Sequence, residues 1–335
     1  MKKVLAIVLA LVMVLGLAAC GGGSSSGGQT TVKAQHLSLG HSNNTEHHYH
    51  TLSTKFAALV EEATGGQLVV DVYPSEQLGS GTAMLEAVKT GSQDMVLDPD
   101  AFLANYDDRF QVFSIPFVMT SWDQVKKFPG SDLQKKFDAI AEENGFVILG
   151  WTANGFRYFS TTKEVNTPND LNGLKLRVGQ NAVMASLYTT YGAQPTSMSM
   201  SEIYNAVQTG LVDGQENPIA NIVGYKLYEV TPYICLTGHV YTWEPLIMSK
   251  AIFDSLTADQ QKALKECGEK ACAEDLEYCS TSEQADFDKC TAGGATIITP
   301  DKAVWQDAVK NFASEVCAKY GDEFTKLYNE YVALK

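Results

Sequence analysis

The sequence lacks several features that would point to an enzyme, a metalloprotein or an integral membrane protein. Its seven cysteines form no CxxC pair, so a structural zinc site is not expected. Between the predicted strands and helices, no serine, cysteine and histidine stand at nucleophile-elbow spacing, and no metal-ligand motif is present. No segment after residue 20 is apolar for long enough to cross a membrane. These absences favour a non-enzymatic protein without a cofactor.

Positive charge is also scarce. The chain has 25 Lys and Arg against 39 Asp and Glu, a formal net charge of −14. An acidic surface argues against nucleic-acid or anionic-lipid binding. The charge of a buried pocket is a separate matter, since an acidic shell can enclose two arginines. With 335 residues and 45% hydrophobic content, the chain can bury a sizeable core and its length suggests two folded units.

The N-terminus predicts export. Lys2 and Lys3 precede "VLAIVLALVMVLGLAA", 16 apolar or small residues that suit a signal peptide better than a membrane span. "LAAC" then resembles the lipobox of bacterial lipoproteins, in which Cys20 becomes the lipidated N-terminus, and "GGGSSSGGQT" has tether composition. The alternative is an ordinary signal peptide with an incidental cysteine. We expect a signal peptide at 1–19, a lipidated cysteine and flexible tether at 20–35, and anchoring to the outer face of the cytoplasmic membrane, at the cell surface or in the periplasm.

From residue 36 onward, strand-like and helix-like runs alternate, which predicts an α/β fold with largely parallel strands. The order recurs in the second half. Residues 87–99, "AVKTGSQDMVLDP", match residues 206–218, "AVQTGLVDGQENP", at six of 13 positions with a constant shift of 119. We interpret the match as two related lobes. Ligands of such folds bind beyond the carboxyl ends of strands, which is where Asp98 and Asn217, partners in the repeat, are expected.

The region after residue 250 predicts one long helix that spans both lobes, because "SLTADQQKALKECGEKACAEDLEYCSTSEQADFDKC" is helical over most of its length. The expected lobe I comprises 36–154 plus about 243–282, and lobe II comprises 155–242 plus about 283–335. Five of the six cysteines after Cys20 lie in or near C-terminal helical sequence, where buried free thiols are expected, although pairing cannot be deduced from spacing. These six are Cys235, Cys267, Cys272, Cys279, Cys290 and Cys317.

Two arginines are each the lone cation in an apolar or aromatic run. Arg157 stands in "GFRYFS" and Arg177 in "LKLRV". A surface position or a structural salt bridge is the alternative for each. Arg177 is the sharper candidate, because it alternates with Leu174 and Leu176 at a strand end and so points to the same edge as Asn217. A guanidinium can hold a carboxylate through two parallel hydrogen bonds.

These motifs, with "LNGLKLRV" and "GAQPTSMSMSEIYNAVQTGLVDGQENP", resemble the solute-binding proteins of tripartite ATP-independent periplasmic (TRAP) transporters, in the C4-dicarboxylate-binding (DctP) family. The resemblance implies a two-lobed periplasmic-binding-protein-like fold that captures an organic acid and delivers it to membrane symporter subunits. It implies that Arg177 clamps the ligand carboxylate, that Arg157 assists, and that Asn217 donates to the same carboxylate. The position of Met200 packs against the ligand in this group and is often aromatic in sialic-acid binders.

The specificity side is less defined by the sequence. His41 and Asn43 follow the first strand opposite Arg177, and Asp98 suits ligand hydroxyls better than a second carboxylate, unless it caps the following helix. The ligand is therefore expected to be a hydroxylated sugar acid, a uronate or aldonate, or else a C4-dicarboxylate. Four further residues are candidates for the cleft, with core packing as the alternative for the aromatic ones: Trp151, Asn154, Tyr241 and Trp243.

The motif "EHHYH", residues 46–50, suggests metal binding, but His36, His41 and His239 are its only histidine partners elsewhere. We expect no metal site there. Two functional alternatives stay open at this point: an exported enzyme acting on an organic acid, and a metal-binding or sensor lipoprotein. A monomer is expected, with dimerisation through the long helix as the alternative.

Overall fold

The computed structural model describes residues 33–334, so the predicted signal peptide, Cys20 and most of the predicted tether lie outside the described residues. Residues Ala34–Lys335 form one compact unit. Within the described part of the chain, no helix has both the length and the apolar character needed to span a membrane.

The same succession of strands and helices occurs twice. The first lobe contains β1 (Gln35–His41), α2 (His48–Ala63), β2 (Leu68–Tyr73), α3 (Gly81–Thr90) and β3 (Met95–Leu97). The second lobe contains β5 (Lys175–Val178), α7 (Ala182–Thr190), β6 (Gln194–Ser197), α8 (Ile203–Gln208) and β7 (Gly214–Pro218). In both, the first strand lies between the other two and pairs with each in parallel. The structure thus confirms the duplication predicted from the sequence.

The repeated aspartates have the same structural role. Asp94 Oδ2 accepts a hydrogen bond from the backbone N–H of Ser38, at 2.7 Å. Asp213 Oδ2 accepts from the backbone N–H of Lys175, at 2.9 Å. Each carboxylate therefore ties the start of its lobe's last strand to the neighbouring parallel strand, and the shared sequence reflects a shared hydrogen-bonding requirement.

Two long antiparallel strands connect the lobes, β4 (Phe146–Thr161) and β9 (Tyr241–Ser249). The strand order is β2-β1-β3-β9-β4-β7-β5-β6. The first part of β4 pairs with β9, and its last five residues pair with β7. The register between β4 and β9 shifts between Ala153 and Gly155, and Gly155 has a φ of 124°, which favours glycine. Outside this order, β8 (Tyr233–Cys235) pairs with the last residues of β4, and β10 (Thr296–Ile298) pairs with β8.

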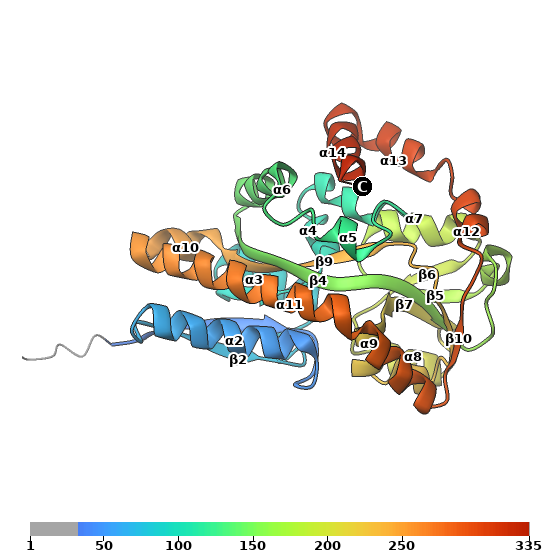
Figure 1. Cartoon of the computed structure of the whole chain (residues 1–335), viewed down its shortest axis with the longest axis horizontal. Coiled ribbons are helices and arrows are strands. Elements are labelled where there is room, and N and C mark those ends of the chain that lie inside the picture. Colours follow the sequence, from blue (N-terminus) through green and yellow to red (C-terminus); the bar gives the residue numbers. More distant parts are fainter. Residues whose placement is uncertain (1–32, 335) are drawn as a thin grey trace, which may run out of the picture. The chain divides into compact units, whose positions relative to one another are not determined.

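Helix α11 (Ala258–Ala292) is 35 residues long and runs along β4, as Figure 1 shows. It also packs against α2 and against α9 (Ile219–Gly224), one element from each half of the chain, which confirms the long helix expected to span both lobes. Its approach to β4 is close. A Cβ built on Gly268 would lie 2.5 Å from the carbonyl oxygen of Leu149, so glycine is required at the contact.

The remaining elements are short helices between the strands and the helices at the C-terminal end of the chain. They are α4 (Asp100–Leu103), η1 (Asp108–Ser114), α5 (Trp122–Val125), α6 (Asp132–Glu143), η2 (Pro168–Leu171), η3 (Leu227–Glu229), α10 (Lys250–Ser255), α12 (Lys302–Ala308), α13 (Phe312–Tyr320) and α14 (Asp322–Ala333).

The C-terminal helix α14 packs against η1 and α6. Ion pairs join Arg109 to Glu323 at 2.9 Å and Lys136 to Glu330 at 2.6 Å. The predicted lobe II includes the end of the chain, whereas η1 and α6 belong to the stretch predicted as lobe I. The lobe boundaries stay a prediction, and this packing places α14 against elements of the predicted lobe I.

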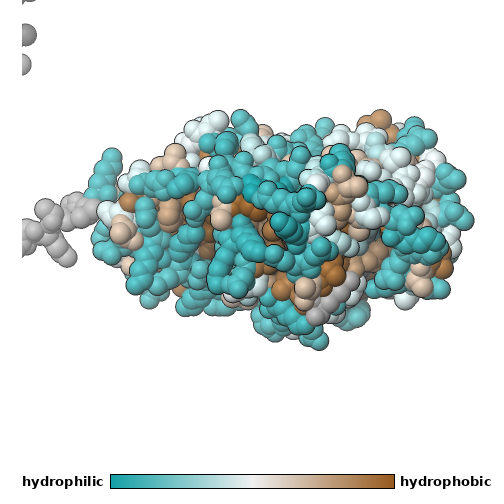
Figure 2. Space-filling model, turned by 90° about the horizontal axis from the view of Figure 1, so that it is seen from above, coloured by the Kyte–Doolittle hydropathy of each residue, from teal (hydrophilic) through white to brown (hydrophobic). Residues whose placement is uncertain are grey.

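The buried hydrophobic residues of the described chain form two clusters, and the smaller one lies between the first-lobe strands, α2 and α11. Hydrophilic residues cover most of the face in Figure 2. The six cysteines of the described residues are all free thiols. Five of them are buried and Cys317 is half-buried. Of the five cysteines in the C-terminal helical region, four are buried as expected, and Cys317 is the exception among the described residues.

Candidate functional site

A polar cavity lies at the carboxyl ends of the parallel strands of both lobes, where β1, β3, β5 and β7 end. Many of its side chains come from the loops and helices that follow these strands, as expected for α/β folds. Seven of the residues predicted from the sequence line it: Asn43, Asp98, Asn154, Arg157, Arg177, Met200 and Asn217. The duplication thus brings together residues that are far apart in the sequence.

Arg177 presents a buried cation to this cavity. It lies in β5 with 4% of its surface exposed, and its Nε donates to the carbonyl oxygen of Met198 at 3.0 Å. Burial lowers the pKa of Arg177 to about 10, and the nearby guanidinium of Arg157 adds to this while the carboxylate of Glu216 opposes it. Among the residues that the structure describes, Arg177 forms no ion pair. A desolvated cation without a counter-ion is costly, and an anionic ligand would supply the missing charge.

Arg157 lines the same cavity but already has a counter-ion. Its Nε and Nη2 donate to the carboxylate of Glu216 in β7, the second contact at 2.9 Å. Nη2 also donates to Asn217 Oδ1 at 3.1 Å, and Nη1 donates to Thr242 Oγ1 at 3.3 Å. Burial lowers the pKa of Arg157, but the Glu216 carboxylate outweighs it and raises the pKa above its ordinary value. Arg157 therefore contributes hydrogen-bonding groups to the cavity wall, but its positive charge is balanced by Glu216.

The amide of Asn217 belongs to the network around this ion pair. Its Oδ1 accepts from Arg157 and from Asn221 Nδ2, the latter at 3.2 Å. Its Nδ2 donates to Gln215 Oε1 and lies 3.6 Å from the sulfur of Met200. A ligand carboxylate would have to compete with Gln215 for this N–H group. The predicted role of Asn217 as a donor to the ligand stays a prediction.

The opposite wall carries polar atoms without partners. Asp98 directly follows β3 and is fully buried, and neither carboxylate oxygen has a hydrogen-bond partner among the described residues. Burial raises the pKa of Asp98 well above its ordinary value, with Glu76 as a second cause. Asn43 Oδ1 is also buried and unpartnered. Helix α4 has Pro99 at its N-cap and no side-chain cap, so the alternative in which Asp98 caps this helix is wrong.

Four predicted residues do not line the cavity. Trp151 and Trp243 lie in the core, where their indole N–H groups donate to Asp138 at 2.8 Å and to the hydroxyl of Tyr331 at 3.3 Å. Tyr241 packs edge-on against Trp243. His41 is fully buried and its Nε2 lies 3.3 Å from His50 Nδ1. Core packing was the alternative to a place in the cleft for the three aromatic residues, and it accounts for their positions.

Several cavity residues were not identified from the sequence. Glu216 stands within "DGQENP", but its pairing with Arg157 depends on the antiparallel register of β7 with β4. Asn181 and Asn221 line the cavity from the first turns of α7 and α9 or just before them. The strand–turn–helix pattern was the signal that could have suggested them, because polar residues at this junction face the strand ends.

Hydrogen bonds bridge the two lobes beside the cavity. The hydroxyl of Tyr225 donates to the carbonyl oxygen of Ser42 at 2.5 Å. Asn44 Nδ2 donates to the carbonyl oxygen of Gly224 at 2.7 Å. These contacts join the loop after β1 to the end of α9, so they depend on how closely the lobes approach each other.

A cavity between two duplicated α/β lobes, with a buried cation that has no counter-ion among the described residues, is the arrangement of a solute-binding protein. The chain belongs to the bacterial extracellular solute-binding proteins of family 7 (DctP), whose sequence model matches residues 39–320. The resemblance drawn from the motifs is thereby confirmed. This family consists of solute-binding proteins of transport systems, and its extracellular description agrees with export of the chain.

Relatives with described ligands share about 30% of the sequence. The chain is 30% identical over 280 residues to the C4-dicarboxylate-binding periplasmic protein DctP of Shewanella loihica, an alignment that covers 82% of each chain. It is 27% identical over 292 residues to the 2,3-diketo-L-gulonate-binding periplasmic protein YiaO of Escherichia coli, covering 87% of this chain and 89% of that protein. Its matches to relatives from Verminephrobacter eiseniae and Sinorhizobium fredii, each 35% identical, span 62% and 44% of those proteins' lengths.

Solved structures of TRAP periplasmic solute-binding proteins confirm the two-lobed fold. One from Sulfitobacter sp. NAS-14.1 with bound β-D-galacturonate has a TM-score of 0.86 and 28% identity, and the match covers 89% of this chain and all of that one. One from Polaromonas sp. JS666 with D-erythronate has a TM-score of 0.86 and 28% identity, covering 90% and 99%. One from Haemophilus influenzae with L-gulonate has a TM-score of 0.85 and 25% identity, covering 90% and 99%.

Proposed function

We propose that this chain is the extracytoplasmic receptor of a TRAP transporter and that it binds a hydroxylated monocarboxylic acid, a uronate or an aldonate. The ligand carboxylate pairs with Arg177, the lobes close around the ligand, and the complex delivers it to the membrane symporter. The observation that carries this proposal is the buried guanidinium of Arg177, which faces the cavity without a counter-ion among the described residues.

The charges of the cavity favour one carboxylate rather than two. Two arginines line it, and one of them, Arg157, is neutralised by Glu216. Arg177 is therefore the one free cation among the described lining residues, which also include the carboxyl groups of Glu76, Asp98 and Asp100. A second ligand carboxylate would lose its hydration without gaining a cation, which is costly in a buried site.

The unpartnered groups opposite Arg177 favour hydroxyls on the ligand. Asp98 in either protonation state, and the Oδ1 of Asn43, can accept a hydrogen bond from an O–H group. A buried acceptor left without a partner costs about 1 to 3 kcal/mol. A ligand hydroxyl would remove this cost, whereas an apolar ligand tail would not. The ligands in the three similar structures, β-D-galacturonate, D-erythronate and L-gulonate, each combine one carboxylate with hydroxyls and support the proposal.

A thermal-shift series with matched ligands tests the proposal. The series contains D-galacturonate, L-gulonate and D-erythronate, with D-galactose as the sugar that lacks a carboxylate and succinate as the dicarboxylate that lacks hydroxyls. A sugar acid present at a hundredfold over its Kd should stabilise the protein by about 2.7 kcal/mol. Galactose and succinate should give no shift at equal concentration. A shift with succinate alone would contradict the monocarboxylate assignment while leaving the receptor role intact.

The membrane association of the receptor is a separate part of the proposal. Cys20 in "LAAC" is the proposed lipid-bearing residue, and the tether after it gives the folded unit reach from the membrane surface. Mass spectrometry of the protein from the membrane fraction should find an N-terminal peptide that begins at a lipid-modified Cys20. An N-terminal peptide that begins at Cys20 without a lipid would contradict the anchor. Size-exclusion chromatography with light scattering would test the expected monomer.

A further inference from the structure

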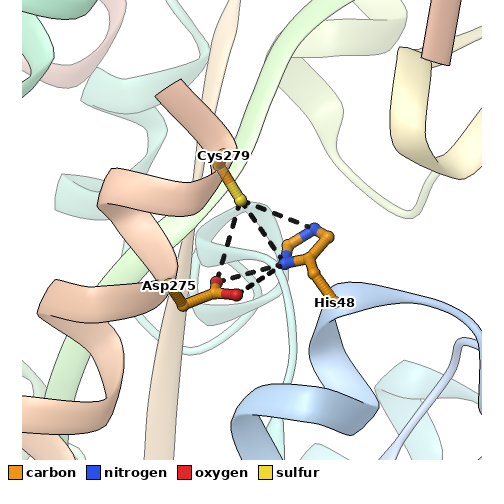
Figure 3. Close-up of side chains that lie close together, drawn as sticks. All are labelled: His48, Asp275 and Cys279. Atoms are coloured by element: carbon orange, nitrogen blue, oxygen red, sulfur yellow. Dashed lines mark hydrogen bonds and ion pairs between the residues drawn. The ribbon is translucent and has the colours of Figure 1, made fainter. Parts of the chain in front are cut away.

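A histidine, an aspartate and a cysteine converge at a buried point between α2 and α11, away from the solute cavity. His48 is the first residue of α2, and Asp275 and Cys279 are one turn apart on α11. Figure 3 shows the three side chains pointing toward one another. Each is 7% exposed, and their ligand atoms lie within 4.8 Å of one another. None of the three is among the residues that line the solute cavity.

The distances within this cluster lie within about 0.4 Å of those between the ligands of a tetrahedral metal ion. His48 Nδ1 lies 3.1 Å from Asp275 Oδ2 and 3.5 Å from Cys279 Sγ. The distance from Cys279 Sγ to Asp275 Oδ2 is 3.9 Å. An ion bonded at about 2.0 Å to nitrogen and oxygen and at about 2.3 Å to sulfur holds such ligands roughly 3.3 to 3.5 Å apart. We propose that His48, Asp275 and Cys279 bind a divalent metal ion of the zinc type.

The surroundings of the cluster supply what a metal site needs beyond its ligands. Thr152 Oγ1 donates to Asp275 Oδ2 at 2.7 Å, a contact that orients the carboxylate. A second cavity is lined by His48 and Cys279 themselves and by the acidic side chains of Glu46, Glu283 and Asp286. This cavity offers an entry path for a cation and room for a water molecule as the fourth ligand.

The donor set selects the class of metal. A thiolate with an imidazole suits Zn²⁺ or Co²⁺, whereas Ca²⁺ and Mg²⁺ require oxygen ligands. Because the thiolate is the metal-binding form of cysteine, metal binding releases the thiol proton of Cys279, and the metal ion must be a strong enough Lewis acid to displace it.

The sequence alone predicts no metal site at "EHHYH", because the motif has few histidine partners elsewhere in the chain. His48 belongs to that motif, but its partners in the cluster lie 227 and 231 positions further along the chain. Asp275 and Cys279 are four positions apart and therefore share one face of α11. Only the packing of α11 against α2 brings the three together.

Titration of the purified, reduced and metal-free protein with Co²⁺ tests this proposal. We expect one equivalent to produce a thiolate-to-cobalt charge-transfer band, and one equivalent of Zn²⁺ to remove it. Cys279→Ser should abolish the band, and His48→Gln should weaken Zn²⁺ binding on the order of a hundredfold. Cys317→Ser is the matched control, because it removes a more exposed thiol outside the cluster, and it should leave the band unchanged. An excess of Ca²⁺ should not displace Co²⁺ from the site, because Ca²⁺ requires oxygen ligands.

Two outcomes would overturn the metal site. One is the absence of a charge-transfer band in the parent protein at one equivalent of Co²⁺. The other is a band that persists in Cys279→Ser and disappears in Cys317→Ser, which would show binding to an exposed thiol. The unfolding transition of each variant, measured without metal, shows whether it still folds. If Cys279→Ser does not fold, His48→Gln carries the test, because unchanged Zn²⁺ affinity in that variant also contradicts the site.

Discussion

Replacement of Arg177 by methionine should stabilise the ligand-free protein and abolish acid binding. The substitution removes a buried cation that has no counter-ion among the described residues and keeps an unbranched, apolar side chain. The two effects have opposite signs because the free protein bears the cost of desolvating Arg177, whereas the complex gains from the charge. Most substitutions of buried residues weaken both stability and function, so this combination is diagnostic.

The magnitude follows from the surroundings of Arg177. Burial lowers its pKa to about 10, and each tenfold change in a proton-binding constant is worth about 1.4 kcal/mol. The drop from the ordinary arginine value therefore corresponds to a destabilisation of about 3 kcal/mol. The lost hydrogen bond to Met198 offsets about 1 kcal/mol. A net gain of about 2 kcal/mol remains, which should raise the Tm of the ligand-free protein by a few degrees.

Loss of the ligand contact should be larger than this gain. Removing one partner of a buried, hydrogen-bonded charge pair costs about 2 to 5 kcal/mol. At 3 kcal/mol the Kd for the sugar acid rises by more than about a hundredfold. Isothermal titration calorimetry measures this change directly, and differential scanning calorimetry without ligand measures the change in Tm.

Arg157→Met is the matched control, because Arg157 is also a buried arginine of the same cavity but has a counter-ion. Its removal leaves the carboxylate of Glu216 buried without its partner, which should destabilise the protein by about 3 to 5 kcal/mol. The two substitutions should therefore shift the Tm in opposite directions. A lower Tm for Arg177→Met, or an affinity within a few-fold of the parent, would refute the assignment of Arg177 as the free cation of the site.

Three further predictions concern closure, packing and pH. Tyr225→Phe removes the hydrogen bond to Ser42 between the lobes and should weaken ligand affinity about fivefold, as measured by calorimetry. Unchanged affinity would show that this hydrogen bond does not stabilise the closed state. Gly268→Ala forces its methyl group against Leu149 and should destabilise the protein by about 1 to 3 kcal/mol in urea unfolding, and an unchanged midpoint contradicts the close approach. Burial lowers the pKa of His41 to about 3, so the unfolded chain binds an extra proton between about pH 6.5 and 3. The free energy of unfolding should therefore fall as the pH is lowered through this range, and His41→Asn should flatten the fall; equal slopes would contradict the buried neutral imidazole.

The parts of the fold that sequence could predict are those encoded locally or by repetition. The match of residues 87–99 to 206–218 places Asp98 and Asn217 at equivalent strand ends. In both repeats a glycine follows the helix, and an aspartate hydrogen-bonds the start of the last strand to its neighbour. Arg177 was identifiable because a lone cation in an alternating apolar strand is costly to bury unless an anion pairs with it. These signals are contained within about a dozen residues each.

Other features depend on contacts that no local pattern records. The pairing of Arg157 with Glu216 requires the register of two antiparallel strands 59 positions apart in the sequence. Whether a buried tryptophan lines a cavity or fills the core depends on neighbours, so Trp151 and Trp243 could not be assigned. The contact of His48 with α11 also requires the tertiary fold.

The duplication explains how one site acquires two chemically distinct walls. Both lobes end their third parallel strand at the cavity, but the repeated position is an acid in the first lobe, Asp98, and an amide in the second, Asn217. The amide can join the network around Arg157 and Glu216, and with that pair neutralised Arg177 is left as the free charge of the second lobe. The acid has no hydrogen-bond partner within residues 33–334, so it leaves the first lobe in need of hydrogen-bond donors. A solute with a carboxylate at one end and hydroxyls at the other satisfies both walls in a single orientation, and it does so only when the lobes are close enough to reach it together.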